Sequence, residues 1–338
     1  MSSLPDWYIP VFTFLFGLCF GSFLNVVALR GLSGEDIFIS RSKCPKCGNK
    51  LKWFMNIPLV SYIFLRGKCA YCKTPISIQY PIVEFLTALF FLLMYLNFGF
   101  TFKALFMCIF TFFFILLALT DILETVILDY HAYILAGFGL LYVILGFSDI
   151  TIVQSILGAV GGFLVFEILS KIGECFAKVR MFGEGDSLIA LALGFIFGLK
   201  GLIIIVAISF IVQTVAAIPV LVINSFKEKK FSLAFTYLFI LFSIVFIATI
   251  NTTHIIKNYT VYLILVFTVC ILLLFSLRVI FKEINAKKEL FEKTDDFEEI
   301  IEKSTFHIMP FGPALIISAF ICIFYLDSIK HFAINLIY

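Results

Sequence analysis

The sequence predicts an all-α polytopic membrane protein with about ten transmembrane helices, and three observations lead to this fold class. First, 62% of the 338 residues are hydrophobic and only 14% are charged, whereas soluble domains are about half apolar and about a quarter charged. Second, apolar runs of roughly 20 residues recur, which is enough to cross ~30 Å of hydrocarbon. Third, basic residues collect in alternate connections between these runs. Together these observations argue against a soluble globular protein.

The apolar runs define the expected spans in chain order. The first run, from Trp7 to Leu29, lacks a basic n-region and a cleavage site, so we expect a retained span and not a cleaved signal peptide. The boundary between two spans near residue 200 has two interpretations, because Gly198-Leu-Lys-Gly201 fits either a tight turn or a kink. The expected spans are 7–29, 80–98, 102–122, 130–147, 151–172, 187–200, 201–224, 231–250, 259–281 and 308–327.

Basic residues in short loops set the orientation, because loops rich in Lys and Arg stay in the cytoplasm. The segment 31–79 carries such residues from Arg41 to Lys73 and is expected to be cytoplasmic. The loops on the opposite side carry few of them, so both chain termini are expected outside. We divide the chain into a first span (1–30), a cytoplasmic loop domain (31–79), a transmembrane core (80–226), an inserted two-span segment with a charged cytoplasmic helix (227–306) and a final span (307–338).

Four of the nine cysteines form two CxxC pairs in this loop, Cys44-Pro-Lys-Cys47 and Cys69-Ala-Tyr-Cys72. Each pair makes a tight turn whose thiolates face one centre, and two such turns complete a tetrahedral zinc site. A reducing cytoplasm disfavours the alternatives, which are two disulfides or a redox pair. Because four thiolates leave no open coordination position, we expect a small cytoplasmic zinc-binding loop domain whose Zn²⁺ is structural.

Two carboxylates lie at expected membrane edges, where an acidic side chain is costly and usually functional. Asp121 ends the span 102–122, and Asp186 follows Gly183-Glu-Gly185 at the start of another apolar run. The expected topology puts both at the cytoplasmic edge, as an aspartic-protease dyad requires. The glycines would let the backbone approach an extended peptide. The same spacing fits an acid of an ion or proton pathway. It also fits an acid at the membrane edge whose side chain only extends to the water interface.

Taken in order, these and other stretches resemble the type IV prepilin leader peptidases, a family of aspartic membrane proteases. The resemblance covers about residues 1–225 and 308–330. The stretches that carry it are Gly21-Ser-Phe-Leu-Asn-Val-Val27 with Arg30, the block from Cys44 to Tyr80-Pro-Ile-Val-Glu84, Asp121, Gly183-Glu-Gly-Asp186, and Pro310-Phe-Gly312-Pro313.

This resemblance implies a multi-pass enzyme of the bacterial inner (cytoplasmic) membrane with its active site at the cytoplasmic face. Such enzymes remove the short basic leader of prepilins or pseudopilins, and many also methylate the new N-terminus with S-adenosylmethionine. The resemblance makes Asp121 and Asp186 the catalytic pair and gives the four cysteines the zinc site of bifunctional members. Expected partners are these substrates, the lipid bilayer, and pilus or secretion assembly proteins, without nucleic acid. The supporting motif residues are Gly183, Gly185, Glu84, Pro310, Gly312 and Pro313.

The chain departs from the family pattern in three places. The family usually has Ile-Pro-Asp where this chain has Ile127-Leu128-Asp129, so the turn after Asp121 loses the rigidity of proline. A lysine is common where Leu188 stands, so a positive charge near the dyad is absent. Residues 227–306 look like an insertion of two spans and a charged helix, which leaves the side of Pro310 unchanged.

The positions of the acidic residues suggest a hypothesis for the role of each. Asp186 at a helix N-terminus is proposed as the base, and Asp121 at a helix C-terminus as the acid, because the helix dipole favours an anion at the former. Glu84 either binds a substrate amine or makes a structural hydrogen bond. The alternatives for the whole protein are a leader peptidase without methyltransferase activity and a non-enzymatic transporter or scaffold; we see no internal repeat of the kind that many transporters carry.

Overall fold

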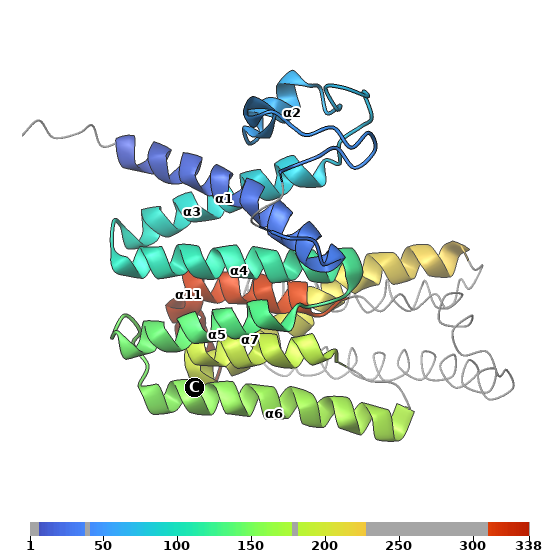
Figure 1. Ribbon diagram of the computed structural model, residues 1–338. Coiled ribbons are helices and arrows are strands. Elements are labelled where there is room, and N and C mark those ends of the chain that lie inside the picture. Colours follow the sequence, from blue (N-terminus) through green and yellow to red (C-terminus); the bar gives the residue numbers. More distant parts are fainter. Residues whose placement is uncertain (1–6, 38–40, 178–181, 228–309, 338) are drawn as a thin grey trace, which may run out of the picture. The chain divides into compact units, whose positions relative to one another are not determined.

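The computed structural model describes residues 7–37, 41–177, 182–227 and 310–337 (Figure 1). Within these ranges the fold is all-helical, with two isolated β-bridges and no strand. The chain divides into two compact units, one of residues Met1–Ser209 with Pro310–Tyr338 and one of Phe210–Met309, and every contact described below lies in the first. The elements are α1 (Tyr8–Ser33), η1 (Trp53–Asn56), α2 (Val60–Phe64), α3 (Gln79–Phe98), α4 (Phe102–Glu124), α5 (Asp129–Ile144), α6 (Ile152–Ala177), α7 (Glu184–Lys227) and α11 (Gly312–Ile337).

Five helices in the described ranges are long and apolar enough to cross a membrane. They are Tyr8–Ser33, Gln79–Phe98, Phe102–Glu124, Ile152–Ile172 and Glu184–Ala217, while α5 and Gly312–Tyr325 of α11 are shorter apolar helices. The polytopic membrane fold is therefore confirmed, but about ten spans are not. Two expected spans, 231–250 and 259–281, lie outside the described residues.

The expected boundary near residue 200 lies at Gly198, within the segment labelled α7. Gly198 has φ 66° and ψ 179°, which interrupts the helical backbone without a connecting loop. A left-handed φ of this kind favours glycine. A Cβ atom added at Gly162 of α6 would lie 2.9 Å from Ala190 O and 2.5 Å from Leu202 Cδ2, although residues twelve apart in a straight helix are ~18 Å apart. The chain therefore reverses direction at Gly198, and the runs 187–200 and 201–224 are two helical parts joined by a tight turn.

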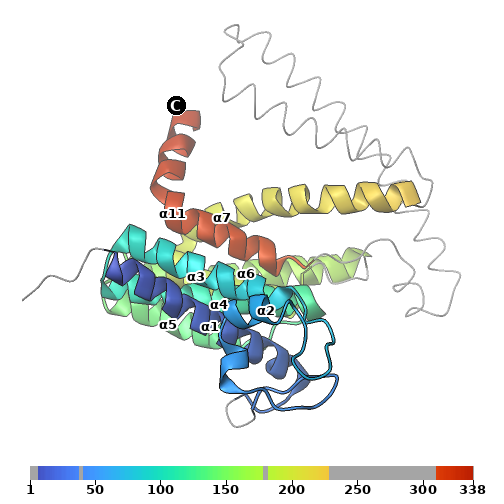
Figure 2. The same cartoon turned by 90° about the horizontal axis from the view of Figure 1, so that it is seen from above.

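Small residues bring α1 and α3 into close contact (Figures 1 and 2). A Cβ atom added at Gly17 would lie 2.6 Å from the Ala88 Cα atom, and one added at Gly21 would lie 2.7 Å from the Glu84 Cα atom. Close backbone approach through glycine and alanine is a common way for helices to pack in membranes. Gly21 of the N-terminal motif therefore serves the packing that positions α3.

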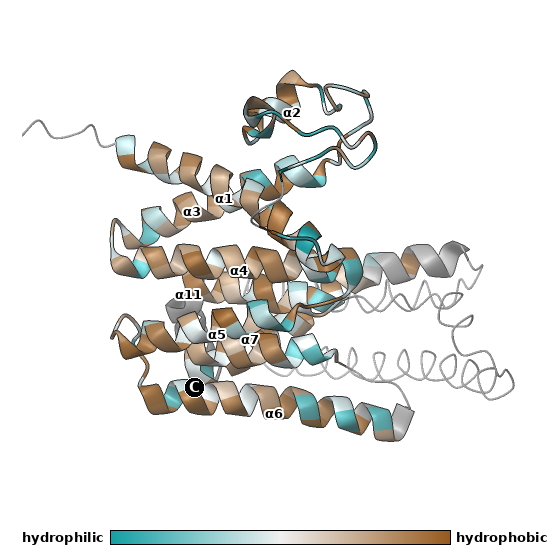
Figure 3. Ribbon diagram, in the orientation of Figure 1, coloured by the Kyte–Doolittle hydropathy of each residue, from teal (hydrophilic) through white to brown (hydrophobic). Residues whose placement is uncertain are grey.

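The main hydrophobic core joins α4, α5, α7 and α11. Phe114 of α4 packs edge-on against Phe320 of α11, with ring centroids 5.5 Å apart, and Phe320 also stacks on Phe90 of α3 at 4.2 Å. Many large apolar side chains of these helices are exposed, and the hydropathy colouring in Figure 3 shows apolar residues along the helices. An apolar exterior around an apolar core is what a bilayer requires of a protein that spans it.

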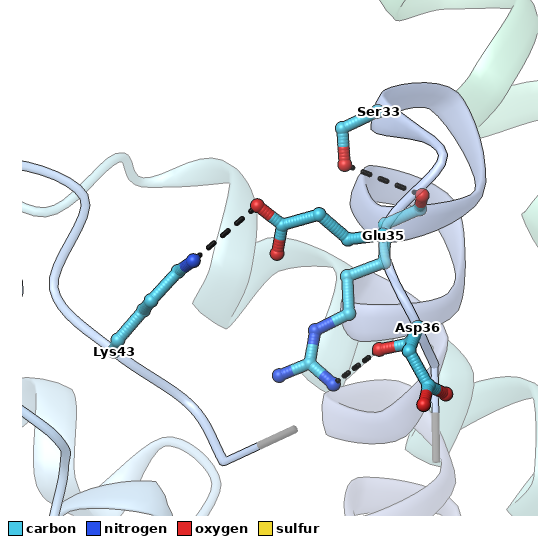
Figure 4. Close-up of polar contacts among 5 residues, drawn as sticks. Ser33, Glu35, Asp36 and Lys43 are labelled. Atoms are coloured by element: carbon cyan, nitrogen blue, oxygen red, sulfur yellow. Dashed lines mark hydrogen bonds and ion pairs between the residues drawn. The ribbon is translucent and has the colours of Figure 1, made fainter. Parts of the chain in front are cut away.

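Charged residues fix the exit of the chain from α1 (Figure 4). The Arg30 Nη1 atom donates hydrogen bonds to the carbonyl oxygens of Asp36 at 3.1 Å and Ile37 at 3.0 Å. Beside it, the Lys43 ammonium forms an ion pair with Glu35 at 3.4 Å. These contacts hold both ends of the short stretch that leads from α1 into the cysteine loop.

Candidate active site

Asp121 and Asp186 are brought together from opposite helix ends. Asp121 lies in the last turn of α4, and Asp186 lies in the first turn of α7. Both side chains are buried, with 5% and 7% of their surfaces exposed, and Asp121 acts electrostatically on Asp186. The structure therefore brings the two acids together where the end of α4 meets the start of α7.

The backbone of the Gly183-Glu-Gly-Asp186 segment holds the Asp186 carboxylate from one side. The Gly183 N–H donates to Asp186 Oδ2 at 3.1 Å, and the Asp186 N–H donates to the Gly183 carbonyl at 3.2 Å. The other oxygen, Oδ1, is buried and has no hydrogen-bond partner among the described residues. Buried polar atoms without partners are rare in native proteins, so this oxygen is available to a water molecule or a substrate.

The Asp121 carboxylate faces the first residue of α11. The Gly312 N–H points toward it, but the buried Oδ2 atom has no partner in full hydrogen-bond geometry within the described ranges. A Cβ atom at position 312 would overlap this same Oδ2 atom and would lie 3.2 Å from Ile189 Cδ1 of α7. Gly312 thus lies where α4, α7 and α11 meet, and Pro313 occupies the first turn of α11, where proline is well tolerated.

Gly185 is needed for packing between two segments of the chain, and not for the approach of a peptide as expected. A Cβ atom there would lie 2.5 Å from the Ile127 Cβ atom, so the glycine lets the turn after α4 pack directly on the start of α7. Around Gly183, in contrast, the nearest atom to an added Cβ is Asp186 Oδ2 at 3.7 Å. Of these two glycines, Gly183 therefore has the more open surroundings among the described residues, as an approaching peptide backbone needs.

Three phenylalanines connect the segments that carry the glycine motifs. Phe182 precedes Gly183, Phe311 precedes Gly312, and their ring centroids are 5.3 Å apart. Phe166 of α6 packs on both, at 5.0 Å from Phe182 and 6.1 Å from Phe311. In addition, the Ser170 hydroxyl donates to the Phe182 carbonyl at 2.9 Å. Sequence reasoning missed this aromatic support, whose one available signal was a phenylalanine directly before each glycine motif.

The two departures from the family pattern near the acids are both accommodated by apolar packing. Leu188 is buried in the main core and its side chain is only 7% exposed. Leu128 precedes α5 with φ −77° and ψ 110°, and its Cδ1 atom lies 2.8 Å from the position of a Cβ at Gly31. Both leucines thus make apolar contacts where the family pattern has lysine or proline.

Glu84 is engaged in a structural hydrogen bond. Its Oε2 atom accepts from the Leu59 N–H at 2.8 Å, and Ser22 of α1 also hydrogen-bonds the carboxylate. Leu59 has φ 58°, a left-handed backbone that is unusual for leucine. The contact fastens the cysteine loop to α1 and α3, which favours the structural role over the binding of a substrate amine.

The four cysteines predicted as metal ligands converge. Their Sγ atoms all lie within 4.8 Å of one another, and Cys44 Sγ is 3.8 Å from Cys72 Sγ. A tetrahedron with ~2.3 Å zinc–sulfur bonds has edges of about 3.8 Å, so the donor set fits zinc. Hydrogen bonds from Thr74, first from its hydroxyl at 3.2 Å, lower the pKa of the Cys72 thiol to about 6. Thiolate character is what a metal ligand needs.

The two cysteine turns repeat one backbone pattern. In each, the first cysteine's carbonyl accepts from the residue four positions on, which is left-handed: Gly48 at φ 69° and Lys73 at φ 60°. The bridge Lys43↔Lys50 of the first turn matches Lys68↔Pro75 of the second. The hydrogen bond from Cys44 N–H to Asn49 O matches that from Cys69 N–H to Thr74 O. The hydrogen bond from Leu51 N–H to Ser42 O matches that from Ile76 N–H to Gly67 O.

Comparison with known proteins agrees with this architecture. Residues 15–98 match the Bacterial Peptidase A24 N-terminal domain, which covers α1 to α3, and residues 108–218 match the Type IV leader peptidase family, which includes both acids. Neither match extends into residues 219–338. No solved structure is similar enough to this chain to count as a match.

Three relatives carry the name Prepilin leader peptidase/N-methyltransferase. The one from Myxococcus xanthus is 38% identical over 199 residues, which is 57% of this chain and 58% of the relative. The one from Neisseria gonorrhoeae is 32% identical and covers 64% of this chain and 84% of the relative. The Vibrio cholerae protein is 32% identical over 57% of this chain and 79% of its own length. With its buried acid pair and these relatives, the chain belongs to the type IV leader peptidase family.

Proposed function

We propose that this protein is a membrane aspartic endopeptidase that removes the basic N-terminal leader of type IV prepilins or pseudopilins. The observation that carries the proposal is the buried pair Asp121 and Asp186, with one oxygen of each free of hydrogen-bond partners among the described residues. Two interacting carboxylates from different helices provide a base and an acid for peptide hydrolysis.

In the proposed reaction, one carboxylate is ionised and the other is protonated. Asp186 lies in the first turn of α7, where the helix dipole favours its anion, so it takes a proton from the attacking water. Asp121 lies in the last turn of α4 and gives its proton to the carbonyl oxygen of the scissile peptide. The C–N bond of the resulting gem-diol intermediate then breaks as the new amine accepts the proton held by Asp186. Asp121 takes a proton back from one hydroxyl group of the intermediate, which becomes the new carboxyl group.

The Gly183 N–H keeps the Asp186 carboxylate in position during these steps, through the hydrogen bond to Oδ2. This leaves Oδ1 directed away from the backbone donor, for the water. On the other acid, the Gly312 N–H points toward the Asp121 carboxylate and its bare Cα leaves room for Oδ2. Positioning of this kind is what lets two weakly acidic side chains act together.

We propose that the site lies at the cytoplasmic edge of the bacterial inner membrane. The basic residues of 31–79 support this orientation, since that loop joins the ends of α1 and α3. The basic leader of the substrate then stays in the cytoplasm, while its apolar helix enters the bilayer beside the spans. Water reaches the scissile bond at this interface.

The names of the relatives support a second activity, the N-methylation of the new N-terminus. The methyl donor would be S-adenosylmethionine, which supplies a methyl group to the amine; we assign no residue to its binding. Zinc held by Cys44, Cys47, Cys69 and Cys72 would be structural, since four thiolates fill a tetrahedral site.

One experiment tests both activities. Purified protein is incubated with a prepilin-like peptide and labelled S-adenosylmethionine, and mass spectrometry measures leader loss and methylation. Asp121→Asn and Asp186→Asn are each expected to abolish cleavage. Glu124→Gln, which changes an exposed acid one turn beyond Asp121, is the matched control and should cleave normally.

Each alternative has its own outcome in this experiment. Cleavage without methyl transfer would identify a leader peptidase that lacks the second activity. Retained cleavage in Asp186→Asn would overturn the catalytic assignment. Failure of the unmodified protein to cleave any prepilin-like peptide would favour the transporter or scaffold.

A further inference from the structure

The cysteine loop exposes an unusual amount of apolar surface. Around η1 and α2, Trp53 is 80% exposed, Ile63 is 71% exposed and Phe64 is 82% exposed. Large apolar side chains gathered within one short segment mark an interaction surface and not an ordinary solvated loop. We call residues Trp53 to Phe64 the apolar segment.

The apolar segment lies beside the membrane spans and not beyond their ends. Leu59, within the segment, donates its N–H to Glu84, which is in the second turn of α3 and about 7 Å along the helix axis from its start. Because α2 begins at the next residue, it shares the depth of the first turns of α3. Figure 1 and Figure 2 agree, since α2 lies along the flank of the α1–α3 pair in both views.

The flank of α3 at this depth is itself apolar and open. Ile78, Ile82 and Phe85 share one face by their helical spacing and are 65%, 47% and 45% exposed. This face belongs to a helix long and apolar enough to span a membrane, so lipid covers it. The apolar segment therefore continues a surface that already faces the bilayer.

The charges around the apolar segment complement an anionic lipid surface. Four exposed basic residues flank it on both sides, and the chain holds no Asp or Glu between Asp36 and Glu84. The ammonium of one of them, Lys52, lies 6.0 Å from the centre of the Phe54 ring, so its methylene chain runs along the apolar surface. Tryptophan and lysine together are typical of membrane interfaces. The flanking basic residues are Lys50, Lys52, Arg66 and Lys68.

We propose that the apolar segment inserts into the lipid leaflet beside α3 and anchors the cysteine loop to an anionic membrane surface. The loop is then held at two places, by the hydrogen bond from Leu59 to Glu84 on one side and by lipid on the other. This fixes its depth relative to the site at the ends of α4 and α7. The inference is independent of the chemistry proposed for Asp121 and Asp186.

The chain offers a direct test because it contains only two tryptophans, Trp7 and Trp53. In Trp7→Phe, Trp53 is the sole tryptophan, and the full chain is reconstituted into vesicles with or without lipids brominated in their acyl chains. We expect the Trp53 emission to be blue-shifted and quenched by the brominated lipid, and to be insensitive to aqueous iodide. Quenching by iodide but not by brominated lipid would overturn the proposal.

Two other occupants of the same surface give distinct results, and both overturn the proposal. Shielding of Trp53 from both quenchers before substrate is added would mean that protein, and not lipid, covers the segment. Exposure to iodide that is lost only when a prepilin peptide is added would make it a substrate-docking surface.

Matched variants in the Trp7→Phe background separate the apolar and the charged contributions. Phe64→Ser should lower the quenching by brominated lipid by about half, whereas Tyr71→Ser, an exposed aromatic of the same loop outside the segment, should not. Adding anionic lipid to neutral vesicles should increase the quenching, and the double change Lys52→Gln with Arg66→Gln should remove that dependence. Equal effects of Phe64→Ser and Tyr71→Ser would contradict the proposal.

Discussion

Gly312 at the start of α11 lies so close to Asp121 at the end of α4 that a Cβ atom at position 312 would overlap the Asp121 Oδ2 atom. Helix α11 therefore lies against the Asp121 carboxylate through the backbone of Gly312, without a side chain between them. The contact links the first residue of α11 to the proposed acid, and the same Cβ position would lie 3.2 Å from Ile189 Cδ1 of α7.

Gly312→Ala should lower kcat/KM for leader cleavage by about 100-fold, because an added methyl group displaces the Asp121 carboxylate and small misplacements are costly in catalysis. The measurement is steady-state cleavage of a prepilin-like peptide. Gly137→Ala is the control, since a Cβ atom there meets nothing within 4 Å. Wild-type kcat/KM in Gly312→Ala would show that the close contact has no catalytic consequence.

Glu84→Gln should leave both cleavage and methylation within about twofold of wild type, because the amide oxygen still accepts from the Leu59 N–H. The loss of a charged acceptor should reduce stability by about 1 kcal/mol, seen as a lower Tm. Glu84→Leu removes the acceptor altogether and should lower Tm further. A selective loss of methylation in Glu84→Gln would instead support a role in binding the substrate amine.

Leu128→Pro should fold and retain activity, although it places proline next to the site. Leu128 already has φ −77°, close to the value that proline imposes, and in the described chain no backbone hydrogen bond uses its N–H. The gain from a stiffer unfolded chain, about 0.4–1 kcal/mol, opposes the lost contact of its side chain with Gly31. Tm should thus change little. Leu135→Pro, in the interior of α5, is the contrasting variant and should unfold the helix.

Cys47→Ser should reduce bound zinc to background in elemental analysis and make residues 41–77 sensitive to limited proteolysis, because three thiolates hold the metal poorly. Cys19→Ser, at an exposed position of α1, should leave the zinc content unchanged. Full zinc content in the Cys47→Ser protein would show that the metal is bound elsewhere.

The cysteine cluster could be predicted from local spacing, whereas spacing and membrane depth left several roles open for Asp121 and Asp186 until the resemblance to the leader peptidases paired them. Two CxxC turns converge whatever lies between them, and Asp121 and Asp186 end up at one edge once the spans are assigned. These features required no knowledge of which helix packs on which.

The residues that the sequence did not reveal act through contacts between distant segments. Ile127 explains Gly185, and Phe166 supports two glycine motifs at once, but neither has a pattern of its own. The structural role of Glu84 depended on a hydrogen bond to a residue in a loop of irregular backbone. The turn at Gly198 was ambiguous because glycine permits both a reversal of the chain and a break within a helix, and contacts with α6 decide between them.

The repeated cysteine turns have a consequence for how the loop folds. Each turn supplies two of the four ligands, so a bound metal acts as a crosslink that closes the chain from Cys47 to Cys69 into a ring containing η1 and α2. Ring closure of this kind lowers the conformational entropy of the unfolded loop, an effect on the order of 3 kcal/mol for a disulfide of similar reach. Metal supply would then govern whether this part of the enzyme is assembled at all, while the hydrophobic bundle that carries the acids folds by its own packing.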